Sequence, residues 1–200
     1  MALRNEQARW GAVSQLLHWL IVALVAAQVS LALVAKHFHH GPKFVAILGM
    51  HKSLGITILA LVVVRLLWRW SNPVPELPGT LKPHERALAR TTHVALYVIL
   101  FALPLTGWAG SSAHGIAVRW FDLFTLPNLV GKNPALSGVL GGVHWLLAVL
   151  LGLVVVLHIA AALRHHYVLK DDTLRRMLPF GRSTVSGETG GDRARRASGV

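Results

Sequence analysis

Two histidines lie inside an almost wholly apolar stretch of the sequence, GGVHWLLAVLLGLVVVLHIAAALRHH, at residues 141–166. His144 and His158 are fourteen residues apart. In a helix this spacing separates them by about 21 Å along the axis and returns the side chain to within about 40° of the same face. An imidazole nitrogen is a ligand for haem iron, zinc and copper. The spacing therefore predicts one metal-ligating ring near each end of one helix face.

Three more histidines lie within apolar segments, at depths that match one of these two rings. Counted from the predicted membrane surfaces, His18 and His93 lie at the depth of His158, and His51 lies at the depth of His144. Two opposed histidines between helices supply both axial ligands of a six-coordinate b-type haem. His51 and His144 therefore predict one haem site, and His158 with either His18 or His93 predicts a second.

Buried histidines have other uses, which compete with this interpretation. A single ring in a membrane helix commonly makes a helix–helix hydrogen bond, and paired rings also bind zinc or copper. A transporter of metal ions or protons is therefore a further hypothesis. The four apolar segments contain no Asp or Glu to complete a metal-transport site, and this composition argues against that hypothesis.

These rings must be positioned by membrane helices. The chain has 200 residues, of which 54% are hydrophobic and only 14% charged. About 20 apolar residues cross a bilayer as a helix. The sequence therefore predicts an all-α, integral membrane four-helix bundle, with Pro104 kinking the third span. The predicted spans are roughly 13–35, 44–69, 87–110 and 138–164.

Charge sets the expected orientation of the bundle. Of the 20 Lys and Arg residues, 14 fall at the two termini and in the loop between the second and third spans, and 4 fall in the other two loops. The positive-inside rule therefore predicts that both termini are cytoplasmic. The same distribution explains the net charge of +12 without nucleic acid, which we exclude as a partner. The absence of cysteine excludes iron–sulfur clusters and thioether-linked haem.

Other residues have expected supporting roles. Lys52 and Arg65 lie within spans, where they would pair with haem propionates or extend to lipid phosphate. His165 and His166 are expected at the interface, solvated or facing lipid. The residues predict a single four-helix domain followed by a disordered, basic Gly/Ser/Arg-rich tail at 181–200.

The chain resembles the bacterial cytochrome b561 family, four-helix di-haem proteins of the inner membrane that are related to the cytochrome b subunits of nickel hydrogenases. The resemblance covers about residues 8–180. It rests on blocks that occur in the family's order: LLHWL at 16–20, MHKSLGI at 50–56, VVRLLWR at 63–69, THVALYVILFALPLTGW at 92–108, VHWLLAVLLG at 143–152 and LHIAAALRHHYVLKDDTLRRMLP at 157–179.

The resemblance implies a set of ligands. His18 and His158 would be the axial ligands of a cytoplasm-side haem b, and His51 and His144 those of a periplasm-side haem b. His93 would then be a supporting residue, either a hydrogen-bond partner or part of a quinone pocket. Because the pairing by depth leaves His18 and His93 both open, this choice comes from the resemblance.

The family moves single electrons to or from quinone in the bacterial inner membrane. One branch oxidises superoxide and passes the electron to ubiquinone, so the resemblance implies a superoxide:ubiquinone oxidoreductase. A membrane anchor or carrier subunit that works with a redox partner protein is the alternative. Lys36, Lys43, Lys52, Arg119 and Lys132 would make the outer face positive and would steer a small anion such as superoxide towards it.

Overall fold

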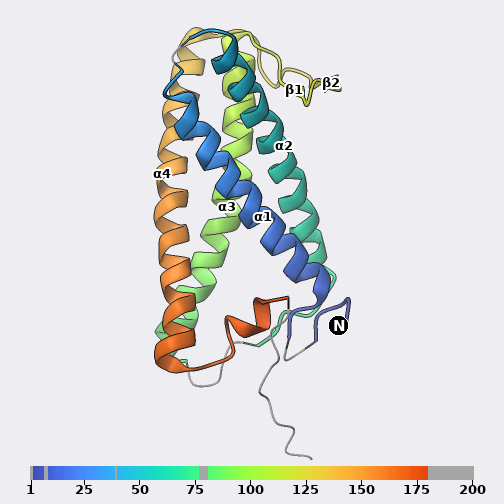
Figure 1. The fold of residues 1–200 in the computed structure, drawn as a ribbon, viewed down its shortest axis with the longest axis vertical. Helices are drawn as coiled ribbons and strands as arrows, with labels where there is room; N and C mark the ends of the chain where they lie inside the picture. Colours follow the sequence, from blue (N-terminus) through green and yellow to red (C-terminus); the bar gives the residue numbers. More distant parts are fainter. Residues whose placement is uncertain (1, 7–8, 39, 77–80, 180–200) are drawn as a thin grey trace, which may run out of the picture.

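Four long helices dominate the computed structural model, which describes residues 2–6, 9–38, 40–76 and 81–179. They are α1 (Ala12–Ala35), α2 (Pro42–Trp70), α3 (Pro83–His114) and α4 (Pro134–Arg164). Figure 1 shows them side by side, running alternately up and down. All four are long and apolar enough to cross a membrane, which confirms the predicted all-α architecture and the four spans. The predicted tail 181–200 lies outside the described residues.

Each helix is longer than its predicted span, because hydropathy detects only the apolar part of a helix. Three of the helices begin with proline, at Pro42, Pro83 and Pro134. Proline suits the first helical position, since the N–H that it lacks has no partner there. α3 continues through Pro104 to His114 and ends at Gly115, whose φ of 87° is readily available only to glycine.

Helix packing follows chain order. The extensive backbone approaches between the long helices are those between α1 and α2, between α2 and α3, and between α3 and α4; α4 has no comparably extensive approach to α1 or α2. Ile21 of α1 packs with Ile58 and Val62 of α2 to form the buried core cluster. In α4 only Leu151 is buried. A helix that is apolar all round and exposed to this extent is suited to lipid contact.

One end of the bundle, called here the hairpin end, carries the α1–α2 and α3–α4 loops. The α3–α4 loop contains a short antiparallel ladder of β1 (Arg119–Trp120) and β2 (Phe124–Thr125), in which Arg119 pairs with Thr125 and Trp120 with Phe124. The predicted spans leave residues 111–137 as the loop between the third and fourth spans, with no strand predicted in it. Figure 1 shows this ladder projecting sideways beside α2.

The opposite end, called here the termini end, carries both described ends of the chain. α4 is extended by a π-helical turn, η1 (His165–Leu169), and a short 3₁₀ turn follows, η2 (Arg175–Met177). The carbonyls of Arg176 and Met177 accept hydrogen bonds from Gln15 Nε2 (3.0 Å) and Trp19 Nε1 (2.9 Å) of α1. The segment after α4 therefore crosses this end of the bundle and joins α4 to α1 (Figure 1).

Candidate functional site

The first histidine pair lies at the hairpin end. His51 of α2 and His144 of α4 face each other with ring centroids 6.3 Å apart and ring planes at 67°. The two helices have no extensive backbone approach to each other, so the two imidazoles meet across the space between them. The structure thus brings together the two residues that the sequence paired by depth.

The second pair lies at the termini end and has the same geometry. His18 of α1 and His158 of α4 have ring centroids 6.3 Å apart and an interplanar angle of 67°. His93 of α3 also approaches His158, with centroids 5.5 Å apart and an angle of 69°. His158 therefore has two histidine neighbours, at different separations.

The separation of 6.3 Å is a test of whether a pair fits a haem iron. Two imidazoles that bind one metal from opposite sides have centroids about 6.2 Å apart, from a metal–nitrogen bond of about 2.0 Å and roughly 1.1 Å from nitrogen to ring centre on each side. His51–His144 and His18–His158 meet this requirement. His93–His158, at 5.5 Å, is too close.

The side chains available as metal ligands also fit a haem. Within residues 2–6, 9–38, 40–76 and 81–179 there is no group of three or more His, Cys, Asp or Glu side chains that could hold a metal ion. Structural zinc sites use four protein ligands and catalytic sites use three. A pair of imidazoles instead suits a cofactor that brings the other four ligands itself, as a porphyrin does.

His144 is held in position by α3. Its Nδ1 lies 3.0 Å from the carbonyl oxygen of Leu103 and 3.2 Å from Thr106 Oγ1. Thr106 Oγ1 already donates to Leu103 O (2.8 Å), so an Nδ1–H that donates to this carbonyl fixes the tautomer and leaves Nε2 as the free lone pair. Carbonyl contacts of this kind orient metal-binding histidines.

Gly107 makes room for the same ring. A Cβ atom at this position would lie 3.1 Å from His144 Cε1 and 3.3 Å from His144 Nδ1. Both distances are shorter than ordinary carbon contacts. A side chain at position 107 would therefore displace the imidazole or the α3–α4 contact, and glycine is needed here for close approach rather than for its φ angle.

His51 has a different environment. Its Nδ1 is buried without a hydrogen-bond partner, and its backbone carbonyl accepts from Gln28 Nε2 at 2.9 Å. Gln28 comes from α1 and lies close to Gly55, where an added Cβ would be 3.3 Å from Nε2. An unpaired buried polar atom costs about 1–3 kcal/mol. A buried polar atom without a partner requires an explanation, and a role in a functional site is one such explanation.

Arg65 of α2 is the cation next to the pair at the termini end. Its Nε donates to Tyr97 Oη (3.1 Å) and its Nη1 to the carbonyl of Ser14 (3.0 Å). The guanidinium is close enough to interact electrostatically with His18, His93 and His158. No carboxylate is within ion-pair distance of Arg65 among the described residues, so its remaining N–H donors are available to an anion.

Lys52 is the cation next to the pair at the hairpin end. Its Nζ donates to Ser111 Oγ of α3 (2.8 Å), which in turn donates to the carbonyl of Ile116 (2.7 Å). The ammonium is thus held at the end of α3, where the last carbonyls favour a positive charge. Like Arg65, Lys52 is held near a histidine pair by neutral groups.

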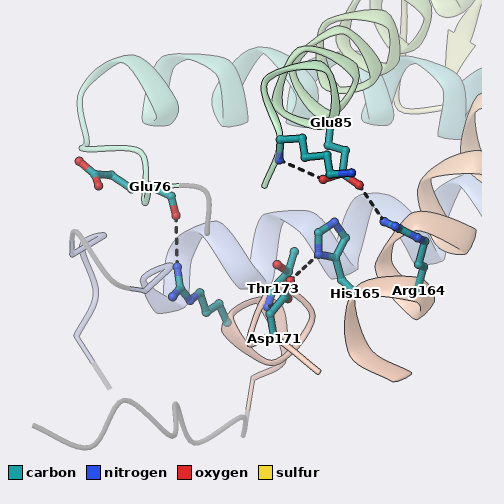
Figure 2. Close-up of polar contacts among 8 residues, drawn as sticks. Glu76, Glu85, Arg164, His165, Asp171 and Thr173 are labelled. Carbon is teal, nitrogen blue, oxygen red and sulfur yellow. Dashed lines mark hydrogen bonds and ion pairs between the residues drawn. The ribbon is translucent and has the colours of Figure 1, made fainter. Parts of the chain in front are cut away.

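His165 does not lie free at the interface, so the prediction for this residue was wrong. Its Nδ1 is 2.5 Å from Asp171 Oδ2, and both side chains are only 15% exposed. Figure 2 shows His165 and Asp171 facing each other next to Thr173, with the Arg164–Glu85 ion pair (3.3 Å) nearby. The chain reverses after η1, and this reversal brings Asp171 back to His165.

The pKa of Asp171 reflects these contacts. Burial raises it, but hydrogen bonds from Thr173 and the contact with His165 outweigh burial and hold the pKa of the carboxyl below its ordinary value of 3.8. Asp171 is therefore ionised at neutral pH and stabilises the turn that follows α4.

Comparison with known proteins identifies the family. The family model described as prokaryotic cytochrome b561 matches residues 9–180. Cytochrome b561 homolog 2 of Escherichia coli (strain K12) is 34% identical over 185 residues, which are 89% of this chain and 95% of that protein. The chain belongs to the prokaryotic cytochrome b561 family. It is accordingly a bacterial membrane protein that carries electrons by means of haem b.

Two further relatives are similar over most of their length. Probable superoxide oxidase CybB of Yersinia pestis is 35% identical over 163 residues, which are 82% of this chain and 92% of that protein. Cytochrome b561 homolog 1 of Escherichia coli (strain K12) is 29% identical over 168 residues, 82% of this chain and 93% of that protein. The family match over residues 9–180 covers all four helices of this cytochrome.

Proposed function

We propose that this cytochrome holds two b haems, one at each end of α4, and carries single electrons between them across the membrane. The observation behind this proposal is the repetition of one geometry. His51–His144 and His18–His158 have the same centroid separation, 6.3 Å, and the same interplanar angle, 67°. Helix packing alone gives no reason for two distant histidine pairs to share both values.

The four histidines are the proposed axial ligands. Haem b, when bound, supplies a one-electron Fe(III)/Fe(II) couple whose potential the protein adjusts. A haem held by two imidazoles would have no open coordination site for oxygen, which would favour electron transfer over oxygen activation. The protein contributes ring orientation, through Leu103 and Thr106 at His144, and an apolar bundle interior that excludes water.

The two cations have proposed roles as propionate partners. Arg65 is placed beside the termini-end pair and Lys52 beside the hairpin-end pair, each held by neutral groups and each with unused N–H donors. Both side chains are half-buried, and a cation withdrawn from water without a carboxylate partner is costly unless an anion approaches it. His93, which is too close to His158 to share a metal with it, is proposed as a neighbouring hydrogen-bond donor or quinone contact.

The proposed orientation places the termini end in the cytoplasm. Most of the lysine and arginine residues of the described chain lie at this end, and positive loops remain on the cytoplasmic side. His18–His158 then lies near the cytoplasmic surface of the bacterial inner membrane, and His51–His144 lies near the periplasmic surface.

Superoxide is the proposed electron donor and ubiquinone the proposed acceptor. Two superoxide ions give up one electron each and become two molecules of oxygen; one ubiquinone takes the two electrons and two protons and becomes ubiquinol. Support comes from the relative named probable superoxide oxidase and from the cations at the hairpin end. In the two loops at this end Asp122 is the only acidic residue, so the face attracts small anions.

The test separates the two half-reactions. The purified cytochrome is mixed with a superoxide-generating system and haem reduction is followed by absorbance; a water-soluble ubiquinone analogue is then added. We expect reduction that superoxide dismutase abolishes, followed by reoxidation by the quinone. Haem that dithionite reduces but superoxide does not would refute superoxide as donor. It would favour a carrier or anchor subunit that takes electrons from a partner protein.

A further inference from the structure

The hairpin formed by β1 and β2 is fastened to the flank of α2. Ser53 is only 2% exposed; its hydroxyl accepts from the backbone N–H of Phe121 (2.9 Å) and donates to the carbonyl of Arg119 (3.1 Å). One turn further along α2, Thr57 Oγ1 accepts from Trp120 Nε1 (3.1 Å). These bonds fix the level of the hairpin along the helix.

That level falls inside the length of α2 that is expected to cross the membrane. Arg69 marks the polar margin of α2 at the termini end, and about 20 residues are needed to cross the hydrocarbon. The opposite margin of the hydrocarbon therefore falls near Gly49. Ser53 and Thr57 then lie about 6 Å and about 12 Å inside it. A hairpin held at these two residues lies at the depth reached by interfacial elements, about 5–10 Å below the headgroups.

The tip of the hairpin is apolar and exposed. Leu123 is 74% exposed, Phe124 55% and Phe121 38%. The rings of Phe121 and Phe124 lie 5.0 Å and 5.2 Å from the ring of Trp120, so the aromatic groups form one cluster. Figure 1 shows the hairpin lying beside α2, outside the four-helix bundle; Trp120 is hydrogen-bonded to α2, whereas Leu123 and Phe124 remain more than half exposed.

The turn is strained in a way that keeps the cluster in this position. Phe121 and Asp122 both have positive φ angles, 46° and 57°, a left-handed conformation that is unfavourable for residues other than glycine. The hydrogen bond from Phe121 N–H to the buried Ser53 offsets part of this cost. Strained backbone of this kind persists where the surroundings require it, often at functional segments.

We propose that residues 119–125 form a membrane anchor, whose tip at Phe121, Leu123 and Phe124 inserts into the lipid leaflet at the hairpin end. The ligand is the interfacial region of a phospholipid bilayer, which accepts aromatic and aliphatic groups at this depth. The nearby charges are paired with each other, Arg119 Nε with Asp122 Oδ1 at 3.3 Å, so no isolated charge has to enter the interface. The proposal depends on the orientation given above only for the identity of the leaflet.

The experiment uses the absence of cysteine from the chain. Leu123→Cys is labelled with an environment-sensitive fluorophore, and the full-length protein is reconstituted into phosphatidylcholine/phosphatidylglycerol vesicles. Asn128→Cys, at an exposed residue of the same loop outside the hairpin, is the matched control. Quenching is measured with aqueous iodide and with lipids that carry a nitroxide near the headgroup.

We expect the label at position 123 to be quenched by the nitroxide lipid and to have an iodide quenching constant about fivefold lower than the label at position 128. Equal iodide quenching at both positions would show that the tip lies in water and would overturn the proposal. Protection from iodide without quenching by the nitroxide lipid would show that protein covers the tip, and this result would also overturn it. Circular dichroism confirms that both labelled variants are folded.

Discussion

The imidazole of His144 donates from Nδ1 to the backbone carbonyl of Leu103 at 3.0 Å, and its ring centroid lies 6.3 Å from that of His51. The carbonyl belongs to α3, whereas His51 belongs to α2. The ring is thus held by one neighbouring helix and lies next to a histidine of another. Orientation of this kind is a typical feature of a metal-binding histidine, and each part of it can be tested by substitution.

Gly107→Val tests the room for His144. A Cβ added at this position would lie 3.1 Å from the ring. Valine should therefore displace the imidazole and lower the haem content from two per chain to about one. Haem is measured as the pyridine haemochrome against protein mass. Gly110→Ala is the control, because its Cβ would be 3.5 Å from Leu140 Cβ, an ordinary contact. An unchanged haem content in Gly107→Val would contradict the account of this site.

Replacement of His18 and His93 separately tests which ring shares a metal with His158. Only His18 lies at the separation that fits. We expect His18→Ala to lose one haem and its low-spin electron paramagnetic resonance signal, and His93→Ala to keep both haems. The reverse result would assign the ligand role to His93.

Arg65→Met tests the role of the cation at the termini end. Loss of a positive charge about 10 Å from the iron, at an effective dielectric constant of about 20, should lower the midpoint potential of one haem by on the order of 70 mV. Tyr97→Phe keeps the charge and removes only one hydrogen-bond acceptor, so its effect should be smaller. Potentiometric titration measures the midpoint potentials of both haems. If neither midpoint potential changes in Arg65→Met, the positive charge is not near a haem.

Asp171→Asn tests the contact with His165 at the end of α4. The pKa of Asp171 is lowered in the folded protein, so its stabilising contribution is complete above the ordinary value of 3.8 and is lost as the pH falls through the folded pKa. At pH 7 the variant should melt about 2–6 °C below the wild type. The difference should disappear at acidic pH, where both proteins carry a neutral side chain; a constant difference at every pH would contradict this account.

The salt dependence of the reaction with superoxide tests electrostatic attraction to the hairpin end. The second-order rate should fall as ionic strength rises. Asp122→Asn should increase the rate at low salt, because it removes the only acidic residue from the two loops at this end. Stopped-flow absorbance of the haem provides both measurements. A rate that does not depend on salt would show that the lysines do not steer the donor.

The four spans and the depth of each histidine could be predicted from the sequence, because hydropathy and the rise per residue are properties of a single helix. The helix ends were predicted less well: α3 reaches His114, four residues beyond the predicted span, because the Ser-rich last turn is helical but not apolar. The choice between His18 and His93 could not be made from depth, since both lie at the level of His158.

Contacts between helices required the structure. Leu103 contributes a backbone carbonyl to His144, and a carbonyl has no sequence signature. Arg65 contacts Tyr97 and Ser14, which depends on the rotation of three helices about their axes. The contact between His165 and Asp171 depends on a π-helical turn and a left-handed Lys170, neither of which follows from local propensity.

The number of haems per chain tests the central claim most directly. A dithionite-reduced minus oxidised spectrum and a pyridine haemochrome are recorded for the wild type, His144→Ala and His158→Ala. The account predicts two b haems in the wild type and about one in each variant, with a different haem missing in each. A wild-type protein with one haem or none, or two variants that lose the same haem, would contradict it.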